Sequence, residues 1–234
     1  MDSDRLVRSI QFPMTFDIGK LQFDLNKVMK LKWTDHYNSM GYSGKWNSLA
    51  LMSQDGNSEN IKAFHNTEKE LVATEALQFC DYFNEILDGF KFEKTAVRLL
   101  QLEVGAVIKP HTDHELGYED GCFRLHIPIV TNPNVVFILD DKRLIMNEGE
   151  CWYINANFTH SVANFGDKNR IHLVIDGVRN DWTDALFFAE SHPEDFVAPP
   201  PKISEEQRLL MIEELRKMDS EGARILLQNL ENPI

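Results

Sequence analysis

The chain has 234 residues, a formal net charge of −13 and 43% hydrophobic residues, which is enough apolar material for a folded core. The acidic balance disfavours nucleic acid and anionic membranes as partners, and three widely spaced cysteines suggest neither a disulfide framework nor a cysteine zinc site. No signal peptide and no run of about 20 apolar residues is found, so we expect a cytoplasmic protein.

A strand and a helix are the first elements that the sequence predicts. WNSLALMS, residues 46–53, combines apolar and β-favouring residues and is followed by the turn signal QDGN. From Glu68 to Leu87, apolar residues recur at helical spacing, and Asp88 with Gly89 then gives a stop signal. We therefore expect a strand over 46–53 and a helix over 68–87.

A series of short β-like runs follows, with turn signals between them. The runs are 96–103, 106–113, 123–131, 134–141, 143–147, 150–156 and 170–177. Regularly spaced strands without helices between them are typical of an antiparallel sandwich or barrel. We therefore predict a mainly β domain over residues 1–188, a double-stranded β-helix of the jelly-roll or cupin-like type with flanking helices.

Residues 189–234 are predicted to form a linker and a C-terminal helical extension. Prolines 199–201 favour extended backbone, and Ser204 with Gln207 fits a capping box at the start of a helix over 203–230. Its apolar face would consist of Leu209, Ile212, Leu215 and Met218. This face could pack on its own domain or on a partner chain, which leaves a homodimer open.

The stretch KPHTDH, residues 109–114, carries the first candidate ligands for a metal. At a strand edge, side chains two residues apart point to the same side, so His111 and Asp113 would project together. The best third ligand is His160, in NFTHSVANFG, and two histidines with one carboxylate form the facial triad of non-haem Fe(II) oxygenases. Alone, His-x-Asp fits a polar loop after a strand better, and His114 has no assigned role.

Two of the predicted strands each present an Arg-x-His pair. Arg124 and His126 alternate with apolar residues in FRLHIPIVT, as Arg170 and His172 do in RIHLVIDG. Burying such a polar face is costly unless it binds an anion, and an arginine can grip a carboxylate with two hydrogen bonds. The alternative is a wet outer sheet face, above all for His172.

Three ordered motifs resemble the core of the aspartyl/asparaginyl β-hydroxylase family. They are KPHTDH, CFRLHIPIVTNP and GECWYINANFTHSVANFGDKNRIHLVIDG, and the match covers residues 96–180. The family consists of Fe(II)- and 2-oxoglutarate-dependent dioxygenases on a distorted double-stranded β-helix, and it includes peptide hydroxylases and bacterial enzymes that hydroxylate free proline. The C-terminal helical segment is also reminiscent of the free-proline branch.

The resemblance implies the metal ligands. His111 and His160 match the family's two iron-binding histidines. Asp113 matches the acidic ligand of the proline-hydroxylase branch, whereas some peptide-hydroxylating members have a residue there that does not bind the metal. An aspartate at this position therefore argues against close kinship with those members.

The resemblance also implies contacts with small molecules. Arg170 matches the arginine that holds the distal carboxylate of 2-oxoglutarate, while Arg124 and His126 match positions that contact the carboxylate of the co-substrate or the substrate. Weaker candidates for substrate contact are Asn155, Asn157 and Trp46. The acidic segment 113–122 is either a lid over the site or an ordinary surface loop.

The expected activity is hydroxylation of a free amino acid, proline or a similar compound. Fe(II), 2-oxoglutarate and O2 would take part, and succinate and CO2 would be released. An alternative is hydroxylation of Asp, Asn or another residue in a peptide or carrier-bound substrate. A second alternative is a cupin-like module that binds Zn²⁺ or Ni²⁺ without catalysis, since ligand type alone does not select iron.

Overall fold

The computed structural model describes residues 5–63, 70–198, 205–218, 220, 222–224 and 226–227. Contacts group them into two compact units, one within Asp4–Ala198 and the other within Pro199–Ile234. The boundary that we placed after residue 188 stays a proposal. None of the described helices has a stretch that is both apolar and long enough to cross a bilayer.

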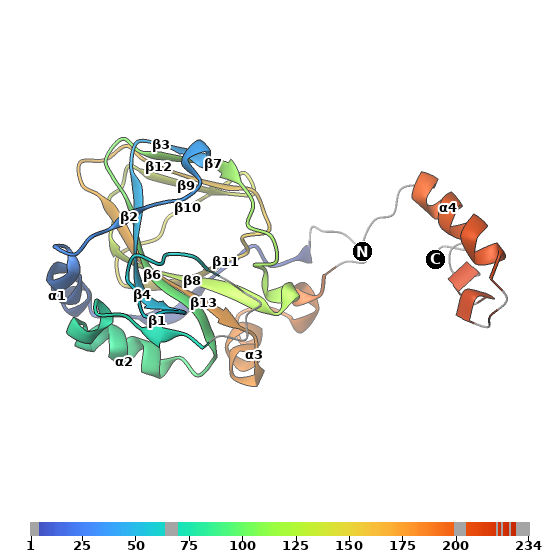
Figure 1. Ribbon diagram of the computed structural model, residues 1–234, viewed down its shortest axis with the longest axis horizontal. Coiled ribbons are helices and arrows are strands. Elements are labelled where there is room, and N and C mark those ends of the chain that lie inside the picture. The colour runs from blue at the N-terminus through green and yellow to red at the C-terminus, as the bar shows by residue number, and fades with distance from the viewer. Residues whose placement is uncertain are drawn as a thin grey trace. The chain divides into compact units, whose positions relative to one another are not determined.

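Two antiparallel sheets form the first unit (Figure 1). Within the described residues the larger sheet has eight strands, in the order β1-β11-β8-β13-β6-β4-β2 with β5 paired to β4. They are β1 (Ser9–Thr15), β2 (Thr34–Asp35), β4 (Trp46–Ser53), β5 (Val72–Ala73), β6 (Lys94–Leu102), β8 (Cys122–Val130), β11 (Glu150–Ile154) and β13 (Arg170–Val178). The smaller sheet, in the order β10-β9-β12-β7-β3, contains β3 (Tyr42–Ser43), β7 (Val107–His111), β9 (Val135–Leu139), β10 (Lys142–Leu144) and β12 (His160–Asn164).

Helices cover the outer face of the larger sheet, opposite the smaller sheet (Figure 1). They are α1 (Ile18–Val28), α2 (Asp81–Gly89) and α3 (Asp181–Phe188). Short 3₁₀ turns lie at η2 (Ser39–Gly41), η3 (Leu77–Phe79), η4 (Tyr118–Asp120) and η5 (Pro193–Phe196). The second unit contains α4 (Glu205–Arg216).

The larger sheet separates an apolar core from a polar interior. Because side chains alternate along a strand, Leu125 and Ile127 of β8 and Leu173 of β13 face the helices and belong to the main core. Their neighbours Arg124 and His126 face the other way, toward the smaller sheet and a cavity between the sheets. The alternation of side chains along these strands is therefore enough to place charged groups inside the barrel.

The predicted mainly β, antiparallel architecture is confirmed, and the strand over 46–53 has the predicted bounds. The sequence prediction lacked β1, α1, α3 and β12. The last omission matters most because β12 begins with His160. Its apolar alternation is short and is bounded by polar residues, which gives a weak strand signal.

The predicted helix over 68–87 is wrong in its first half. Residues 64–69 lie outside the described part of the chain, and from Glu70 onward the backbone is not helical until η3. Thr74 bonds instead to β4, since its backbone N–H donates to Leu51 and its hydroxyl to Ala50. The helix α2 begins at Asp81, where the Asp24 carboxylate accepts hydrogen bonds from two backbone N–H groups. Because this capping residue is distant in the sequence, the residues next to the helix give no signal for its start.

The predicted C-terminal helix over 203–230 is shorter than expected. The continuous helix α4 ends at Arg216, and further helical residues occur at 222–224 and 226–227. The expected capping residue Ser204 lies outside the described residues. Of the predicted apolar face, Ile212 is buried, whereas Leu209 and Met218 are exposed.

Candidate metal centre and its cavity

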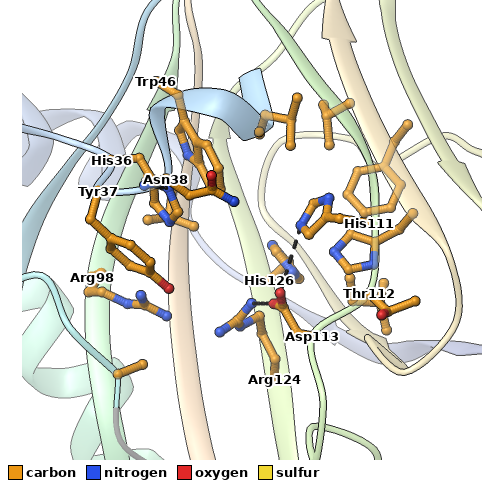
Figure 2. A pocket seen from close by; sticks show the side chains of 18 of the residues that line it. His36, Tyr37, Asn38, Trp46, Arg98, His111, Thr112, Asp113, Arg124 and His126 are labelled. Carbon is orange, nitrogen blue, oxygen red and sulfur yellow. Dashed lines mark hydrogen bonds and ion pairs between the residues drawn. The ribbon is translucent and has the colours of Figure 1, made fainter. Parts of the chain in front are cut away.

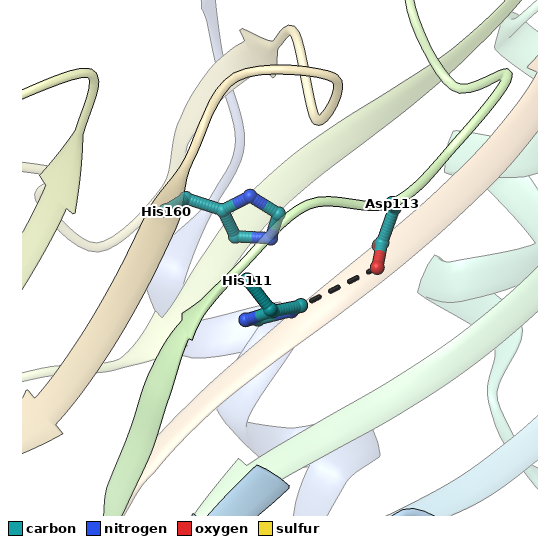
Figure 3. A group of neighbouring side chains, drawn as sticks. All are labelled: His111, Asp113 and His160. Atoms are coloured by element: carbon teal, nitrogen blue, oxygen red, sulfur yellow. Dashed lines mark ion pairs between the residues drawn. The ribbon is translucent and has the colours of Figure 1, made fainter.

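Two strands of the smaller sheet bring the three predicted metal ligands together. His160 on β12 lies directly opposite His111 on β7. Asp113 follows two residues after β7 ends, and its backbone N–H donates to the carbonyl of Ala156 over 2.9 Å. One ligand atom from each of the three side chains lies within 4.8 Å of the others (Figure 3). Small side-chain rotations would bring all three atoms to a single ion.

Both histidines are oriented by backbone carbonyls. The Nδ1 atom of His111 lies 2.8 Å from the carbonyl oxygen of Lys109, and that of His160 lies 3.0 Å from that of Phe158. Because a carbonyl only accepts, Nδ1 carries the proton in each ring and Nε2 keeps its lone pair for a metal. Burial also lowers the pKa of His160, which favours the neutral, metal-binding form.

Asp113 is part of a chain of ion pairs that runs across the larger sheet. Arg124 donates from Nη1 to Oδ2 of Asp113 over 2.6 Å (Figure 2). It also donates from Nε to Oδ1 of Asp176 over 2.6 Å. Arg98 donates to Oδ2 of Asp176 over 2.8 Å. Burial opposes ionisation of Asp113, but Arg124 and the neighbouring histidines outweigh it, so its pKa lies below the usual value.

Arg170 is a buried cation at the base of the same cavity. Its Nη2 donates to Nδ1 of His172 over 3.0 Å, and its guanidinium lies 5.8 Å from the ring centre of Phe137. Burial lowers the pKa of Arg170 to about 9. Among the described residues no carboxylate forms an ion pair with it, so the site favours a bound anion.

The two interior histidines are not on a wet surface. His172 is 2% exposed, which overturns the alternative of an outer, solvated sheet face. His126 is 5% exposed, and in the described structure neither of its ring nitrogens has a hydrogen-bond partner. Burial, followed by the nearby Arg170, holds the pKa of His126 well below its usual value.

A cavity of about 400 Å³ connects these groups (Figure 2). Trp46 lines it as expected, and its ring stacks on His36 with 3.6 Å between ring centres. The side chains around it also include Tyr37, Arg98, Leu100, Ile108, His111, Asp113, His114, Arg124, His126, Ile154, His160 and Arg170. His114 is exposed, in agreement with a solvated neighbour of the site.

The side chains of Asn155 and Asn157, the predicted substrate contacts, have partners in the acidic loop. Neither residue lines the cavity. The side-chain amide of Asn155 donates to both carboxylate oxygens of Glu119, and that of Asn157 donates to Glu119 and Asp120. Both asparagines therefore hold the acidic loop to the barrel.

The acidic segment 113–122 is a packed loop. Leu116 and Tyr118 are fully buried, and the Tyr118 hydroxyl donates to the Asp184 carboxylate over 2.7 Å. These contacts favour the ordinary surface loop over the lid that the sequence left open.

Sequence reasoning missed Arg98, Asp176 and His36. A signal for two of them was present, because Asp176 continues the alternation of Arg170 and His172, and Arg98 stands alone as a charge within an apolar strand. His36 carried no signal, since its place beside Trp46 depends on the pairing of β2 with β4.

The chain matches known proteins over the barrel that holds this site. A family model described as Aspartyl/Asparaginyl beta-hydroxylase matches residues 17–180. An L-proline cis-4-hydroxylase from Rhizobium meliloti (strain 1021) is 30% identical over 186 residues, covering 78% of this chain and 61% of the relative. An L-proline cis-3-hydroxylase 1 from Streptomyces sp is 30% identical over 183 residues, covering 75% and 57%. The chain thus spans about three fifths of the length of these curated relatives.

One solved structure is similar in fold. It is an oxidoreductase of the 2OG-Fe(II) oxygenase family from Burkholderia pseudomallei, with a TM-score of 0.50 and 12% sequence identity. The match covers 75% of this chain and 88% of that chain. The predicted jelly-roll type of fold is therefore confirmed.

Proposed function

Because the chain belongs to the aspartyl/asparaginyl β-hydroxylase family, we propose that it is an Fe(II)- and 2-oxoglutarate-dependent dioxygenase that hydroxylates a free amino acid, with proline or a close analogue as substrate. One observation carries the proposal. His111, Asp113 and His160 converge on one point, and the buried Arg170, which no carboxylate among the described residues pairs with, lies in the same cavity. The proline hydroxylases among the relatives direct the choice of substrate.

The donor set fits Fe(II). Two neutral imidazoles and one carboxylate on one side of an ion are the ligands that non-haem Fe(II) oxygenases use. Both histidines have Nε2 available because carbonyls hold their Nδ1–H groups. When bound by these three side chains, Fe(II) would supply the activation of O2 that couples conversion of 2-oxoglutarate into succinate and CO2 to hydroxylation of the substrate.

The co-substrate fits Arg170. A dianionic acid would compensate the buried guanidinium, and a carboxylate can accept two parallel hydrogen bonds from it. His172 orients this arginine through the 3.0 Å hydrogen bond to Nη2. We assign the unpartnered ring nitrogens of His126 to the same ligand, since a buried imidazole without partners needs one.

The carboxylate of the amino acid fits Arg98 better than Arg124. Arg124 is already engaged by two protein carboxylates. Arg98 lines the cavity and is 6% exposed, and its Nε atom has no hydrogen-bond partner in the part of the chain that the structure describes. The stacked rings of Trp46 and His36 would form an apolar wall against the substrate's carbon skeleton and keep water from it.

Three roles follow for the chain's own residues. The triad holds the ion, Arg170 orients the co-substrate, and the arginine and aromatic wall of the outer cavity position the carbon that is attacked. All three cysteines are free and buried, which agrees with the proposed cytoplasmic location. A small-molecule substrate, with neither nucleic acid nor a membrane as partner, completes the proposal.

Formation of succinate from 2-oxoglutarate, measured with Fe(II) under air across the proteinogenic amino acids, tests this function. We expect free proline or an analogue to stimulate succinate release and to gain one oxygen atom by mass spectrometry. Stimulation by peptides alone would indicate a peptide or carrier-bound substrate. An anaerobic mixture with Fe(II) and 2-oxoglutarate that develops no visible charge-transfer band would indicate a metal-binding module without this chemistry.

A further inference from the structure

The arginine next to the metal site has its donors on protein carboxylates. Three of its guanidinium nitrogens donate to Asp113 or Asp176 over 2.6–3.0 Å. We propose that Asp176 is a positioning residue, which acts through Arg124 to hold Asp113 with one carboxylate oxygen toward the metal and the other turned away. This inference rests on the proposed function, because it assigns Asp113 to an Fe(II) ion.

The sheet register builds this arrangement. Asp176 on β13 lies directly opposite Arg124 on β8, and Arg98 comes from β6 on the other side of β13. All three side chains point to the interior face of the larger sheet, since they alternate with core residues such as Ile175. The central carboxylate is therefore fully buried between two arginines.

The two oxygens of Asp113 have different surroundings. Its Oδ2 accepts from Nη1 of Arg124 over 2.6 Å, while its Oδ1 lies 3.7 Å from Nε2 of His111 (Figure 3). Nε2 is the atom that would bind the metal, so Oδ1 is the oxygen on the metal side. Arg124 thus divides the carboxylate into a metal oxygen and a hydrogen-bonded oxygen, which is the arrangement of a monodentate ligand.

Asp176 keeps Arg124 in this role. It accepts a hydrogen bond from Nε of Arg124 over 2.6 Å and another from Nη2 over 3.0 Å. The third nitrogen, Nη1, is then left to donate to Asp113. Without the charge of Asp176, Arg124 would be drawn onto Asp113 with two parallel hydrogen bonds, a geometry that occupies both oxygens. The guanidinium would then compete with the ion for Oδ1.

Charge balance leads to the same expectation. The chain of ion pairs contains two arginines and two aspartates, all of them near the site. If Asp176 is replaced by a neutral residue, the two arginines face only one carboxylate, that of Asp113. One positive charge then stays uncompensated beside the cation site. Both effects weaken metal binding, and partners behind a metal ligand typically contribute about 10- to 100-fold to affinity.

The test compares Asp176→Asn with Asp24→Asn in the full-length chain, with Co(II) as a spectroscopic probe and Fe(II) under anaerobic conditions. Asp24 is a matched control because it is also a buried aspartate, 1% exposed, but it caps α2 and does not line the cavity. We expect Asp176→Asn to bind both ions about 10- to 100-fold more weakly and to change the visible Co(II) spectrum. Asp24→Asn should lower thermal stability while leaving ion affinity and spectrum as in the wild type.

A second variant covers the case in which Asp176→Asn does not fold. Arg124→Lys keeps the charge but offers one nitrogen, which cannot bridge two carboxylates, and we expect the same loss of ion affinity with an altered Co(II) spectrum. Wild-type affinity and an unchanged spectrum in either folded variant would overturn the proposal. These measurements do not require turnover. The difference in ion affinity between variant and wild type tests this inference. Absence of ion binding by the wild type would instead contradict the proposed function.

Discussion

The two faces of the larger sheet use the same strands for opposite purposes. On β8 and β13, Leu125, Ile127 and Leu173 face the helices in a core of buried apolar side chains. One residue away along each strand, Arg124 and His172 face the interior between the sheets, and Arg124 lines the cavity. Burial is extensive on both faces, but the helix face carries the larger apolar core, and removing apolar surface from water lowers the free energy of the fold.

The comparison shows where stability and function are separated. Buried charges are costly to desolvate, even when they are paired. Their presence in the middle of otherwise apolar strands therefore indicates ligand binding. Substitutions on the helix face should change stability alone. Substitutions on the cavity face should change ligand binding, with an added loss of stability where a paired buried charge such as Asp176 is removed.

The strongest test of the cavity face is Asp113→Ala. We expect hydroxylation to be lost and the affinity for Fe(II) to fall by more than about 100-fold, because a direct ligand contributes more than the partners behind it. The unfolding midpoint of the metal-free protein should change little, since the side chain is partly exposed. Anaerobic calorimetry with Fe(II) and urea unfolding measure the two effects, and retained full activity would remove Asp113 from the triad.

Leu173→Ala is the converse change on the helix face. Leu173 is fully buried, and truncation of such a leucine typically destabilises a protein by about 2–5 kcal/mol. We expect that loss in urea unfolding, while Fe(II) affinity measured well below the unfolding transition stays at the wild-type value. A large drop in affinity would show that the two faces are coupled.

Arg170→Met tests whether this buried guanidinium binds 2-oxoglutarate. Loss of hydrogen bonds to a charged group, about 1.5–3 kcal/mol, should raise the concentration of 2-oxoglutarate needed for half-maximal succinate formation by about 10- to 100-fold. Affinity for Fe(II) should be unchanged. The metal-free variant should be as stable as the wild type or more so, because a buried charge without a carboxylate partner is removed. An unaltered requirement for 2-oxoglutarate would assign this arginine a structural role.

Because His126 and His172 are buried, we expect the stability of the fold to decrease at acidic pH. Burial holds the pKa of His126 and of His172 well below the usual value of 6.5. The unfolded chain therefore takes up protons first as the pH falls below about 6.5. Below that pH, each of these histidines should lower the free energy of unfolding by up to about 1.4 kcal/mol per pH unit. Above it, neither histidine lowers the free energy of unfolding.

Urea unfolding of the metal-free protein between pH 7.5 and pH 5 measures this dependence. His126→Leu should reduce the slope, because the proton uptake of one buried histidine is gone. A slope identical to that of the wild type would show that His126 is protonated to the same degree in the folded and unfolded states.

The smallest effect is expected for His114→Ala. His114 is exposed and is not one of the three clustered ligands. Fe(II) affinity and turnover should stay within about twofold of the wild type, as for most surface substitutions. An inactive variant would mean that His111 and His114 have been assigned the wrong way round.

Part of the site could be predicted from the sequence because strand alternation is local. His-x-Asp at a strand edge and the two Arg-x-His pairs follow from a period of two. The structure places all of these residues except His172 around one cavity, and His172 bonds to Arg170 behind it. The role of Arg124 could not be predicted in this way. Its partner Asp176 lies 52 positions away, and only strand pairing makes them neighbours.

The asparagines before His160 illustrate the same limit. Asn155 and Asn157 stand close to a ligand in sequence, which favoured a role in substrate binding. Their side chains turn to Glu119, 36 and 38 positions away. Proximity in the chain did not decide the partner, because the fold brings the Glu119 carboxylate, a hydrogen-bond acceptor, next to both amides.

The sequence by itself determined the antiparallel β architecture, the alternation of apolar and charged side chains, and the residues that can bind a metal, because each depends on chemistry within a few positions. The tertiary structure alone decided that His160 lies opposite His111. It also decided that Arg124 is held by Asp113 and Asp176, and that Nε of Arg98 has no hydrogen-bond partner among the described residues. These pairings depend on strand register, which is set by packing of the whole sheet against its helices.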